Sequence, residues 1–200
     1  MKYPFKHIVL FSCIILVVSL SVVSCQEDVT PKPAAKLRLE YPEPVYKKTI
    51  IDLPFSFEKN ELASNIKTRK IAGDASYGLN LEYPRLKGTV YLTYKAIHNS
   101  EEKLISYLRD AQNFTQEHTQ KADEIFSDLY ENPEKKVYGM FYEVGGNAAS
   151  QSQFYVTDSV NHFLTGSLYF YTKPNYDSIY PAADYLKNDI RHIMETIDWK

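Results

Sequence analysis

A 16-residue apolar run near the N-terminus constrains most strongly what this chain can fold into. The run extends from Ile8 to Val23, with Lys2 and Lys6 before it and no acidic residue until Glu27. A permanent membrane-spanning helix needs about 20 apolar residues. The run is therefore too short to span a bilayer and has the character of an export signal. We exclude it from the folded protein.

The run ends in Val22-Val23-Ser24-Cys25, which is two aliphatic residues and a small residue before a cysteine. This order resembles the bacterial lipobox, in which the cysteine thiol receives a diacylglyceryl group before cleavage. The alternative is an ordinary secretory signal with an incidental Cys25. We favour the lipoprotein interpretation and predict that residues 1–24 are removed and that Cys25 is the lipidated first residue. Its acyl chains, at about 0.8 kcal/mol for each buried methylene, would anchor the protein to a membrane without crossing it.

Cleavage at this site leaves 176 of the 200 residues, and the formal charge changes from −2 to −4 because Lys2 and Lys6 are lost. Cys13 is also lost and Cys25 carries lipid, so no thiol remains for a disulfide or for a thiolate metal site. No basic patch stands out, so we do not expect nucleic acid as a partner. A chain of this length can bury a core as one domain without such cross-links.

The rest of the chain divides into a tether and one globular domain. Residues 25–46 contain four prolines and no apolar periodicity, which predicts an extended tether. We expect a single domain over residues 47–200. Its predicted strands cover residues 50–57, 77–83, 88–97, 137–144, 153–157 and 162–171. The clearest alternation lies in residues 88–97, where Val90, Leu92, Tyr94 and Ala96 share one face, and Thr89, Tyr91, Thr93 and Lys95 share the other.

Two amphipathic helices complete the prediction. Ser100 is the expected N-cap of a helix that continues to about Tyr130, where Asn132-Pro133 stops it. A second helix begins near Asn175 and ends near Trp199. The element order predicts an α+β fold, an antiparallel sheet packed by a long inserted helix and a C-terminal helix. The order also resembles the Mog1/PsbP-like α/β/α sandwich, by analogy alone.

The sequence contains no recognisable catalytic motif. The nucleophile elbow, the HExxH helix, the P-loop and the dinucleotide fingerprint are all missing. His118 lies on the apolar stripe of the first helix, where a structural histidine is the favoured interpretation. His192 and Glu195 share a helix face, which is weak evidence for a metal. We predict no catalytic residue, no cofactor and no metal site.

The most distinctive polar stretch is residues 145–150. Gly145 and Gly146 permit positive φ, and Asn147 tolerates a left-handed backbone, so a tight or bulged turn accounts for this stretch. The alternative is an exposed contact loop on a rigid hairpin, with Gly145, Gly146, Asn147 and Ser150 as its candidate residues. The two interpretations are compatible.

A family resemblance covers essentially the whole mature chain. The residues that carry it include Pro54-Phe55-Ser56-Phe57, Lys87-Gly88-Thr89-Val90-Tyr91, Gly146-Asn147-Ala148-Ala149-Ser150, Pro174-Asn175-Tyr176-Asp177-Ser178 and Trp199-Lys200. In order and spacing they resemble the gliding-motility lipoprotein GldD family of Bacteroidetes-type bacteria. One departure is Leu53, where the family pattern has a cysteine, so a general role for a thiol at that position is not implied.

The resemblance implies a non-enzymatic accessory or assembly factor of the gliding machinery, which shares parts with type IX secretion. Its working parts would be the lipid at Cys25, the tether and a tyrosine-rich docking face for other envelope proteins. The alternative is a lipoprotein that binds a small apolar ligand or a glycan in a tyrosine-lined pocket. We expect a lipid-anchored protein of the cell envelope, with the outer membrane favoured over the inner and its side left open.

Overall fold

The computed structural model describes residues 40–71, 75–118, 122–171 and 176–200. All of them lie in one compact unit, Lys36–Lys200. The signal segment, Cys25 and most of the predicted tether lie outside the described residues, so their assignments stay predictions.

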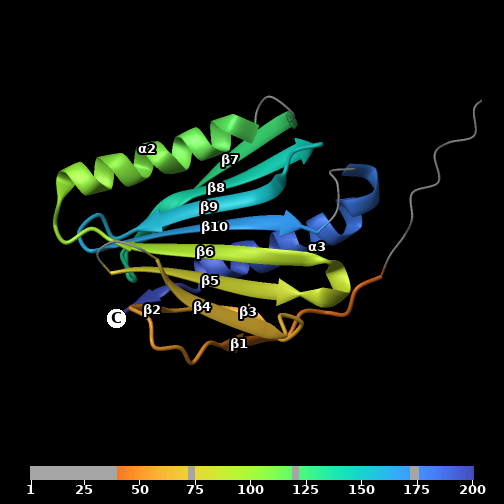
Figure 1. Cartoon of the computed structure of the whole chain (residues 1–200), viewed down its shortest axis with the longest axis horizontal. Helices are drawn as coiled ribbons and strands as arrows, with labels where there is room; N and C mark the ends of the chain where they lie inside the picture. Colours follow the sequence, from red (N-terminus) through yellow and green to blue (C-terminus); the bar gives the residue numbers. More distant parts are fainter. Residues whose placement is uncertain (1–39, 72–74, 119–121, 172–175) are drawn as a thin grey trace, which may run out of the picture. The chain divides into compact units, whose positions relative to one another are not determined.

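An antiparallel sheet forms the middle of the described fold (Figure 1). Its seven described strands have the order β4-β5-β6-β10-β9-β8-β7, and each neighbouring pair is antiparallel. A short 3-10 helix, η1 (Pro84–Leu86), joins the second and third of these strands. The strands are β4 (Asn65–Ile71), β5 (Ser76–Tyr83), β6 (Gly88–Ala96), β7 (Ala122–Asn132), β8 (Val137–Gly146), β9 (Ser150–Thr157) and β10 (His162–Phe170).

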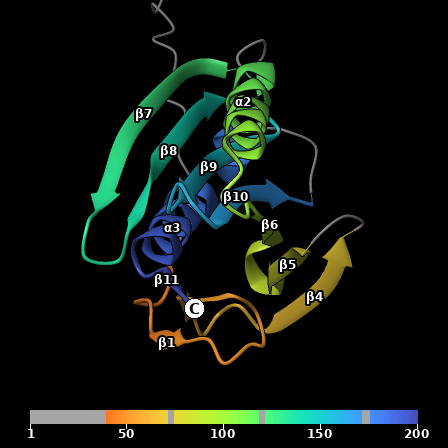
Figure 2. The same cartoon turned by 90° about the vertical axis from the view of Figure 1, so that its left-hand side faces the viewer.

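The two α-helices of the described chain cover opposite faces of this sheet (Figures 1 and 2). They are α2 (Glu101–His118) and α3 (Tyr176–Glu195). In β10, Phe163 packs with side chains of α2, whereas the next residue, Leu164, packs in the core that contains α3. Successive side chains of a strand point to opposite faces of the sheet. Helices α2 and α3 therefore pack on opposite faces. The α+β fold with one inserted and one C-terminal helix is confirmed, while the likeness to Mog1/PsbP stays a prediction.

The main core lies between the sheet and α3. The apolar face predicted for the C-terminal helix is buried there, and the helix contacts β9 and β10 most. Burial of this stripe stabilises the fold at about 25 cal/mol per Å² of apolar surface. The fully buried residues of this face are Leu186, Ile190, Ile193, Met194 and Ile197.

A small N-terminal layer closes the core beside α3. Strand β1 (Tyr46–Lys48) pairs with β3 (Glu58–Asn60), and β2 (Phe55–Ser56) pairs with β11 (Asp198–Trp199). The predicted strand over residues 50–57 is therefore wrong except at its end. The chain folds back on itself here, because the Thr49 amide donates to the Phe57 carbonyl at 2.8 Å. Pro54, which lacks an N–H, falls in the connection.

The prediction of one long helix to Tyr130 is wrong. The helix ends at His118, and residues 122–132 form the edge strand β7, paired with β8. The apolar steps of three and four that suggested a helix also fit this strand. A β-bulge between Ala122 and Glu124 places three residues of β7 opposite two residues of β8. Ala122, Ile125 and Leu129 therefore face the same side of the sheet.

Smaller differences concern element ends. The edge strand β4 was not predicted, because its sequence NIKTRKI is mostly polar and six of its seven residues are exposed. Strand β9 begins at Ser150, earlier than predicted. Helix α3 ends at Glu195, earlier than predicted, and contains Pro181. The predicted strands 137–144, 153–157 and 162–171 correspond to β8, β9 and β10, which pair in sequence order as a meander.

Candidate functional site

The two faces of the central strands differ in chemistry. In β6, Leu92 and Tyr94 point toward α3 and are buried. Tyr91, Thr93 and Lys95 point the other way and are only half-buried. The alternation predicted for this strand is thus confirmed. Its second face is aromatic and polar, which makes it unlike a continuous apolar core.

Helix α2 covers part of this second face. It begins as predicted, since Ser100 Oγ accepts a hydrogen bond from the Lys103 amide at 3.3 Å. Its inner side chains are half-buried, which is less than those of α3. They are Leu104, Tyr107, Leu108 and Ala111, and they pack against a small cluster made of Ile97, Tyr155 and Phe163.

A cavity of about 290 Å³ lies on the α2 face of the sheet. Its size is at the lower end of the ~300–1,000 Å³ that ligand pockets usually occupy. Strands β6, β8, β9 and β10 supply most of its lining and α2 supplies the rest. The lining residues are Tyr91, Thr93, Lys95, Tyr107, Asp110, Ala111, Tyr142, Gln153, Phe154, Tyr155, Phe163, Thr165, Ser167 and Tyr169.

Aromatic rings from different elements meet in this lining. The Tyr155 and Phe163 rings of neighbouring strands stack with centroids 6.0 Å apart and planes 9° apart. The Tyr107 ring of α2 lies 5.6 Å from Phe163, and the Tyr142 ring lies 6.3 Å from Tyr155. These contacts link α2 to the sheet and hold the rings around the cavity in fixed orientations.

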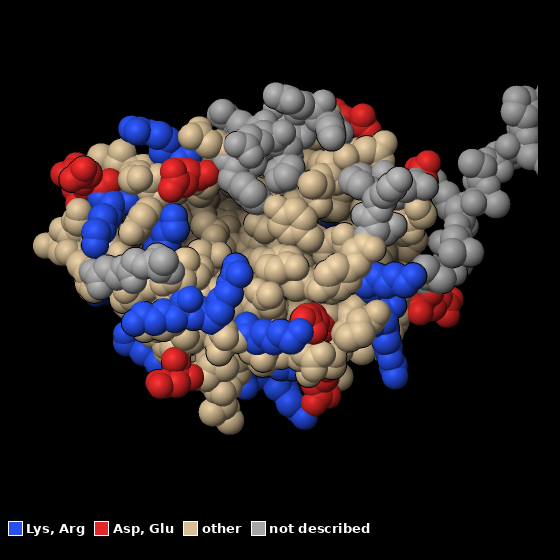
Figure 3. All heavy atoms as spheres, in the orientation of Figure 1, with Lys and Arg blue, Asp and Glu red and all other residues tan. Residues whose placement is uncertain are grey.

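Polar side chains lie among the rings. Thr93, Thr165 and Ser167 contribute hydroxyls and Gln153 contributes a buried amide. At the edge, the Lys95 ammonium lies 3.5 Å from the Asp110 carboxylate and 4.5 Å from the centre of the Tyr107 ring. Figure 3 shows this side of the molecule, with uncharged side chains over its centre and Lys and Arg side chains gathered below them.

Three tyrosine hydroxyls of the cavity, those of Tyr91, Tyr142 and Tyr155, stay protonated at neutral pH. The pKa of Tyr142 is raised to about 12, mainly because the hydroxyl is partly buried and secondly because Tyr155 lies beside it. Burial also raises the pKa of Tyr155 and, together with Tyr171, that of Tyr91. A protonated phenol both donates and accepts hydrogen bonds. The cavity therefore offers polar groups of both kinds beside flat apolar surfaces, which suits binding better than acid–base chemistry.

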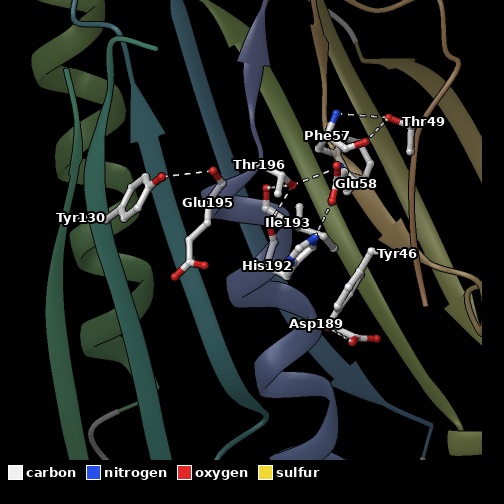
Figure 4. A network of polar contacts seen from close by, with 10 residues as sticks. All are labelled: Tyr46, Thr49, Phe57, Glu58, Tyr130, Asp189, His192, Ile193, Glu195 and Thr196. Carbon is white, nitrogen blue, oxygen red and sulfur yellow. Dashed lines mark hydrogen bonds and ion pairs between the residues drawn. The ribbon is translucent and has the colours of Figure 1, made fainter. Parts of the chain in front are cut away.

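A second polar cluster surrounds Asp189 on α3 (Figure 4). This carboxylate is 1% exposed and accepts hydrogen bonds from Asn60 Nδ2 at 3.0 and 3.1 Å and from the Tyr46 hydroxyl at 2.8 Å. Burial raises the pKa of Asp189 above its ordinary value, and these hydrogen bonds act in the opposite direction. The cluster joins the N-terminal layer to α3. Its carboxylate is out of reach of a substrate, so its role is structural.

His192 belongs to the same region and does not pair with Glu195 as a ligand set. Its Nε2 lies 2.9 Å from Glu58 Oε2, and the Tyr46 ring stacks on it at 3.6 Å. The Glu195 carbonyl accepts a hydrogen bond from the Tyr130 hydroxyl at 3.1 Å (Figure 4). Both residues therefore fasten α3 to neighbouring strands.

Two further histidines, His162 and His118, lie elsewhere in the chain. His162 Nδ1 lies 2.8 Å from the Tyr94 hydroxyl, and its ring stacks on Trp199 at 5.0 Å. Burial lowers the pKa of His162, and the nearby Asp158 acts in the opposite direction. The side chain of His118 lies outside the described residues, so its structural role stays a prediction.

The four candidate residues of the contact loop are mostly enclosed. Gly145 and Gly146 end β8, and Ser150 begins β9, and all three are buried. Gly146 carries the positive φ of the turn, +87°, and an added Cβ would lie 2.7 Å from Asp123 Oδ2. Asn147 is exposed, yet its Oδ1 accepts a hydrogen bond from the Tyr176 amide at 2.9 Å. The turn geometry is present, and the contact role stays a prediction.

Sequence reasoning offered a tyrosine-lined pocket as an alternative without placing it on any element, and it did not identify the Asp189 cluster. The polar face of residues 88–97 was a signal for the cavity, and residues 162–170 repeat it with Thr165, Ser167 and Tyr169. For Asp189 the signal was its position, three residues after Leu186 and one before Ile190, on the apolar side of α3. Neither pattern shows which elements pack against it.

No group of three or more His, Cys, Asp or Glu in the described part of the chain could hold a metal ion. Within the same part, no helix has the length and apolar character needed to cross a membrane.

Comparison with known proteins gives one finding. A family model described as "Gliding motility lipoprotein GldD" matches residues 26–199. No curated protein and no solved structure matches the chain. The match begins directly after the predicted lipidation site and includes all the lining of the cavity.

Proposed function

We propose, on the premise that this chain belongs to the gliding motility lipoprotein GldD family, that it is an accessory or assembly factor of the gliding machinery. Family membership implies a lipoprotein of the cell envelope. The proposal adds that the protein is non-enzymatic, that its machinery is linked to type IX secretion and that it binds other envelope proteins. The observation that carries it is the family match over residues 26–199.

The site geometry supports a binding role over a catalytic one. The buried carboxylate Asp189 is held by Asn60 and Tyr46, away from solvent. At the cavity, Lys95 and Asp110 neutralise each other, and a raised pKa keeps the Tyr142 and Tyr155 hydroxyls protonated. A general acid or base needs a pKa near the working pH and access to a substrate. The described site supplies aromatic surface and hydroxyls instead.

Anchoring by lipid at Cys25 completes the proposal. The family match starts at residue 26, which agrees with a mature chain that begins at the cysteine. We favour the outer membrane over the inner one. The Pro-rich tether over residues 25–46 would hold the domain away from the lipid surface.

The proposal is tested by purifying the intact lipoprotein from membranes of its source bacterium after mild cross-linking. We expect components of the gliding or secretion machinery to co-purify, and deletion of the gene to abolish gliding or secretion. A deletion strain with normal gliding and normal secretion would contradict the accessory role.

A second function is favoured by one specific observation, the cavity of about 290 Å³ under α2. A protein that only docks to partners has no need of a ring-lined cavity of this volume. The cavity supports an envelope lipoprotein that binds a small apolar ligand or a glycan. The two functions are compatible, since a bound ligand could be what the machinery recognises.

A further inference from the structure

The lining of the α2 cavity differs in composition from the main core. Among the described residues that line it, Ala111 is the only aliphatic one. The core against α3 is instead rich in Leu, Ile and Val side chains. A lining of rings and short polar side chains therefore sets this space apart from a gap in ordinary core packing.

This composition discriminates between an acyl chain and a sugar. An acyl chain has no hydrogen-bonding groups, so burying Thr165, Ser167 and Gln153 against it would leave their polar atoms without water. A pyranose ring has C–H faces that pack flat on aromatic rings and hydroxyls that pair with polar side chains. The lining supplies both kinds of partner within one space.

Two further features fit an uncharged ring. The Lys95 and Asp110 side chains at the edge pair with each other, so they bring no net charge to the cavity. The volume of about 290 Å³ is at the lower limit for ligand pockets, which suits one sugar unit better than a long oligosaccharide.

We propose that the cavity between α2 and the sheet binds a single neutral sugar unit of an envelope glycan. Tyr107 and Tyr155 supply ring surfaces, while Thr165, Ser167 and Gln153 supply hydrogen bonds. This inference rests on the second proposed function, ligand binding in the cavity, and names the ligand class. It does not depend on the accessory role in gliding.

The test is saturation-transfer NMR on the full lipoprotein, solubilised in detergent. The full chain is used because residues 40–200 alone would lack any contribution of the tether. The saccharide probes are methyl glucoside, methyl mannoside, methyl rhamnoside and cellobiose. Sodium laurate is the acyl probe. We expect saturation transfer to at least one saccharide and competition among those that bind.

Two variants locate the binding site. Thr165→Phe places a ring in the cavity from the central strand β10, where aromatic residues suit a strand. It should abolish saturation transfer to the saccharide. Tyr107→Ala removes one ring of the lining from the half-exposed face of α2 and should weaken affinity by about threefold to tenfold, the size of an aromatic contact.

Tyr180→Ala is the matched control, because Tyr180 is a helical tyrosine that is 44% exposed and does not line this cavity. It should bind the saccharide as the parent does. Melting temperatures identify any variant that fails to fold, and either of the two cavity variants alone is sufficient for the test.

The outcomes separate the class of ligand from the existence of a site. Transfer to a saccharide that Thr165→Phe or Tyr107→Ala reduces, with Tyr180→Ala unchanged, supports the proposal. Transfer only to laurate, reduced by the same variants, would overturn the sugar class and leave ligand binding in place. No transfer to any probe, or transfer that neither cavity variant reduces, would overturn the site itself.

Discussion

Asn147 fixes the start of α3 from outside the helix. Its Oδ1 accepts a hydrogen bond from the backbone amide of Tyr176, which lies 29 residues later. The first amides of a helix have no partner within it, so a side-chain acceptor satisfies one of them. This contact makes Asn147 a capping residue, whatever else the exposed turn contacts.

Asn147→Ala should therefore lower the free energy of unfolding by about 0.5–1.5 kcal/mol, because one capping hydrogen bond is lost. Chemical denaturation measures the change. Asn161→Ala is the matched control: Asn161 is exposed in the β9–β10 turn, and its backbone makes the contacts there. Equal stability of the Asn147 variant and the parent would show that the cap contributes nothing.

Asp189 is the second residue whose role depends on the fold. Its neighbours Asn60 and Tyr46 donate to it from the N-terminal layer. Asp189→Ala should lower the free energy of unfolding by about 1–2 kcal/mol, since buried donors would lose their acceptor. Relief of the buried charge offsets part of that loss.

Asp184→Ala is the control for this change, because Asp184 is on the same helix with a side chain that is 51% exposed. It should change stability by less than about 0.5 kcal/mol. If the two variants unfold at the same denaturant concentration, the Asp189 cluster is not a stabilising contact.

His162 makes the stability depend on pH. Burial lowers its pKa in the folded protein, so the unfolded chain binds a proton more readily. The stability that neutral His162 contributes is present above the ordinary histidine value of 6.5 and is lost as the pH falls toward the lower folded value. His162→Phe, which can keep the stack on Trp199, should flatten the profile of unfolding free energy between about pH 7 and pH 5. An unchanged slope would rule out this histidine as the cause.

At the scale of elements, β7 depends on its partner strand more than on a core. It pairs with β8 from Ala122 to Asn132, at the edge of the sheet. Phe126 and Leu129 are 60% and 65% exposed. Neither α2 nor α3 covers these side chains fully, so the hairpin is held by backbone hydrogen bonds and by contacts such as Arg191 with Asp128 at 2.7 Å.

A pair of phenylalanine substitutions tests this account. Phe126→Ala should change the free energy of unfolding by at most about 0.5 kcal/mol, as expected for an exposed site. Phe141→Ala, in the neighbouring strand, should cost about 3–5 kcal/mol because its side chain is fully buried. Thermal or chemical denaturation of both variants gives the comparison. Losses of similar size would mean that β7 is covered in solution.

At the scale of the whole described domain, a sheet has one face closed by α3 and the other partly covered by α2. The closed face provides the stability, and the partly covered face provides the cavity. The N-terminal layer is fastened to α3 by Asp189 and by Tyr185, whose hydroxyl donates to the Pro42 carbonyl at 2.9 Å. The chain that comes from the predicted anchor is therefore attached to the most stable part of the domain.

Anchoring is the prediction at this scale. Cys25→Ser should prevent lipidation and move the protein from the membrane fraction to the soluble one, because no acyl chain remains to be buried. Fractionation followed by immunoblotting measures the shift, and Cys13→Ser, inside the signal segment, is the control that should stay with the membrane. A Cys25 variant that still sediments with membranes after a high-salt wash would contradict the lipobox.

Several features follow from local sequence because their physical cause is local. The alternation in residues 88–97, the Ser100 cap and the apolar face of α3 each appear in a short stretch, and the structure has all three. The family and the α+β class follow from the order of such stretches. Secondary structure is less certain where one spacing fits two geometries, as at residues 122–132, where a bulged strand reproduces the apolar steps of a helix.

Only the tertiary structure decided which polar side chains work together. Asp189 meets Asn60 across 129 positions, and the cavity collects side chains from α2 and four strands. Such contacts depend on the packing of elements that are distant in sequence, and no local pattern encodes that packing. The sequence by itself determined the export signal pattern, the family and the type of most elements. The fold determined that the sheet face toward α2, which carries several tyrosines, contains a cavity, because α2 covers only part of that face.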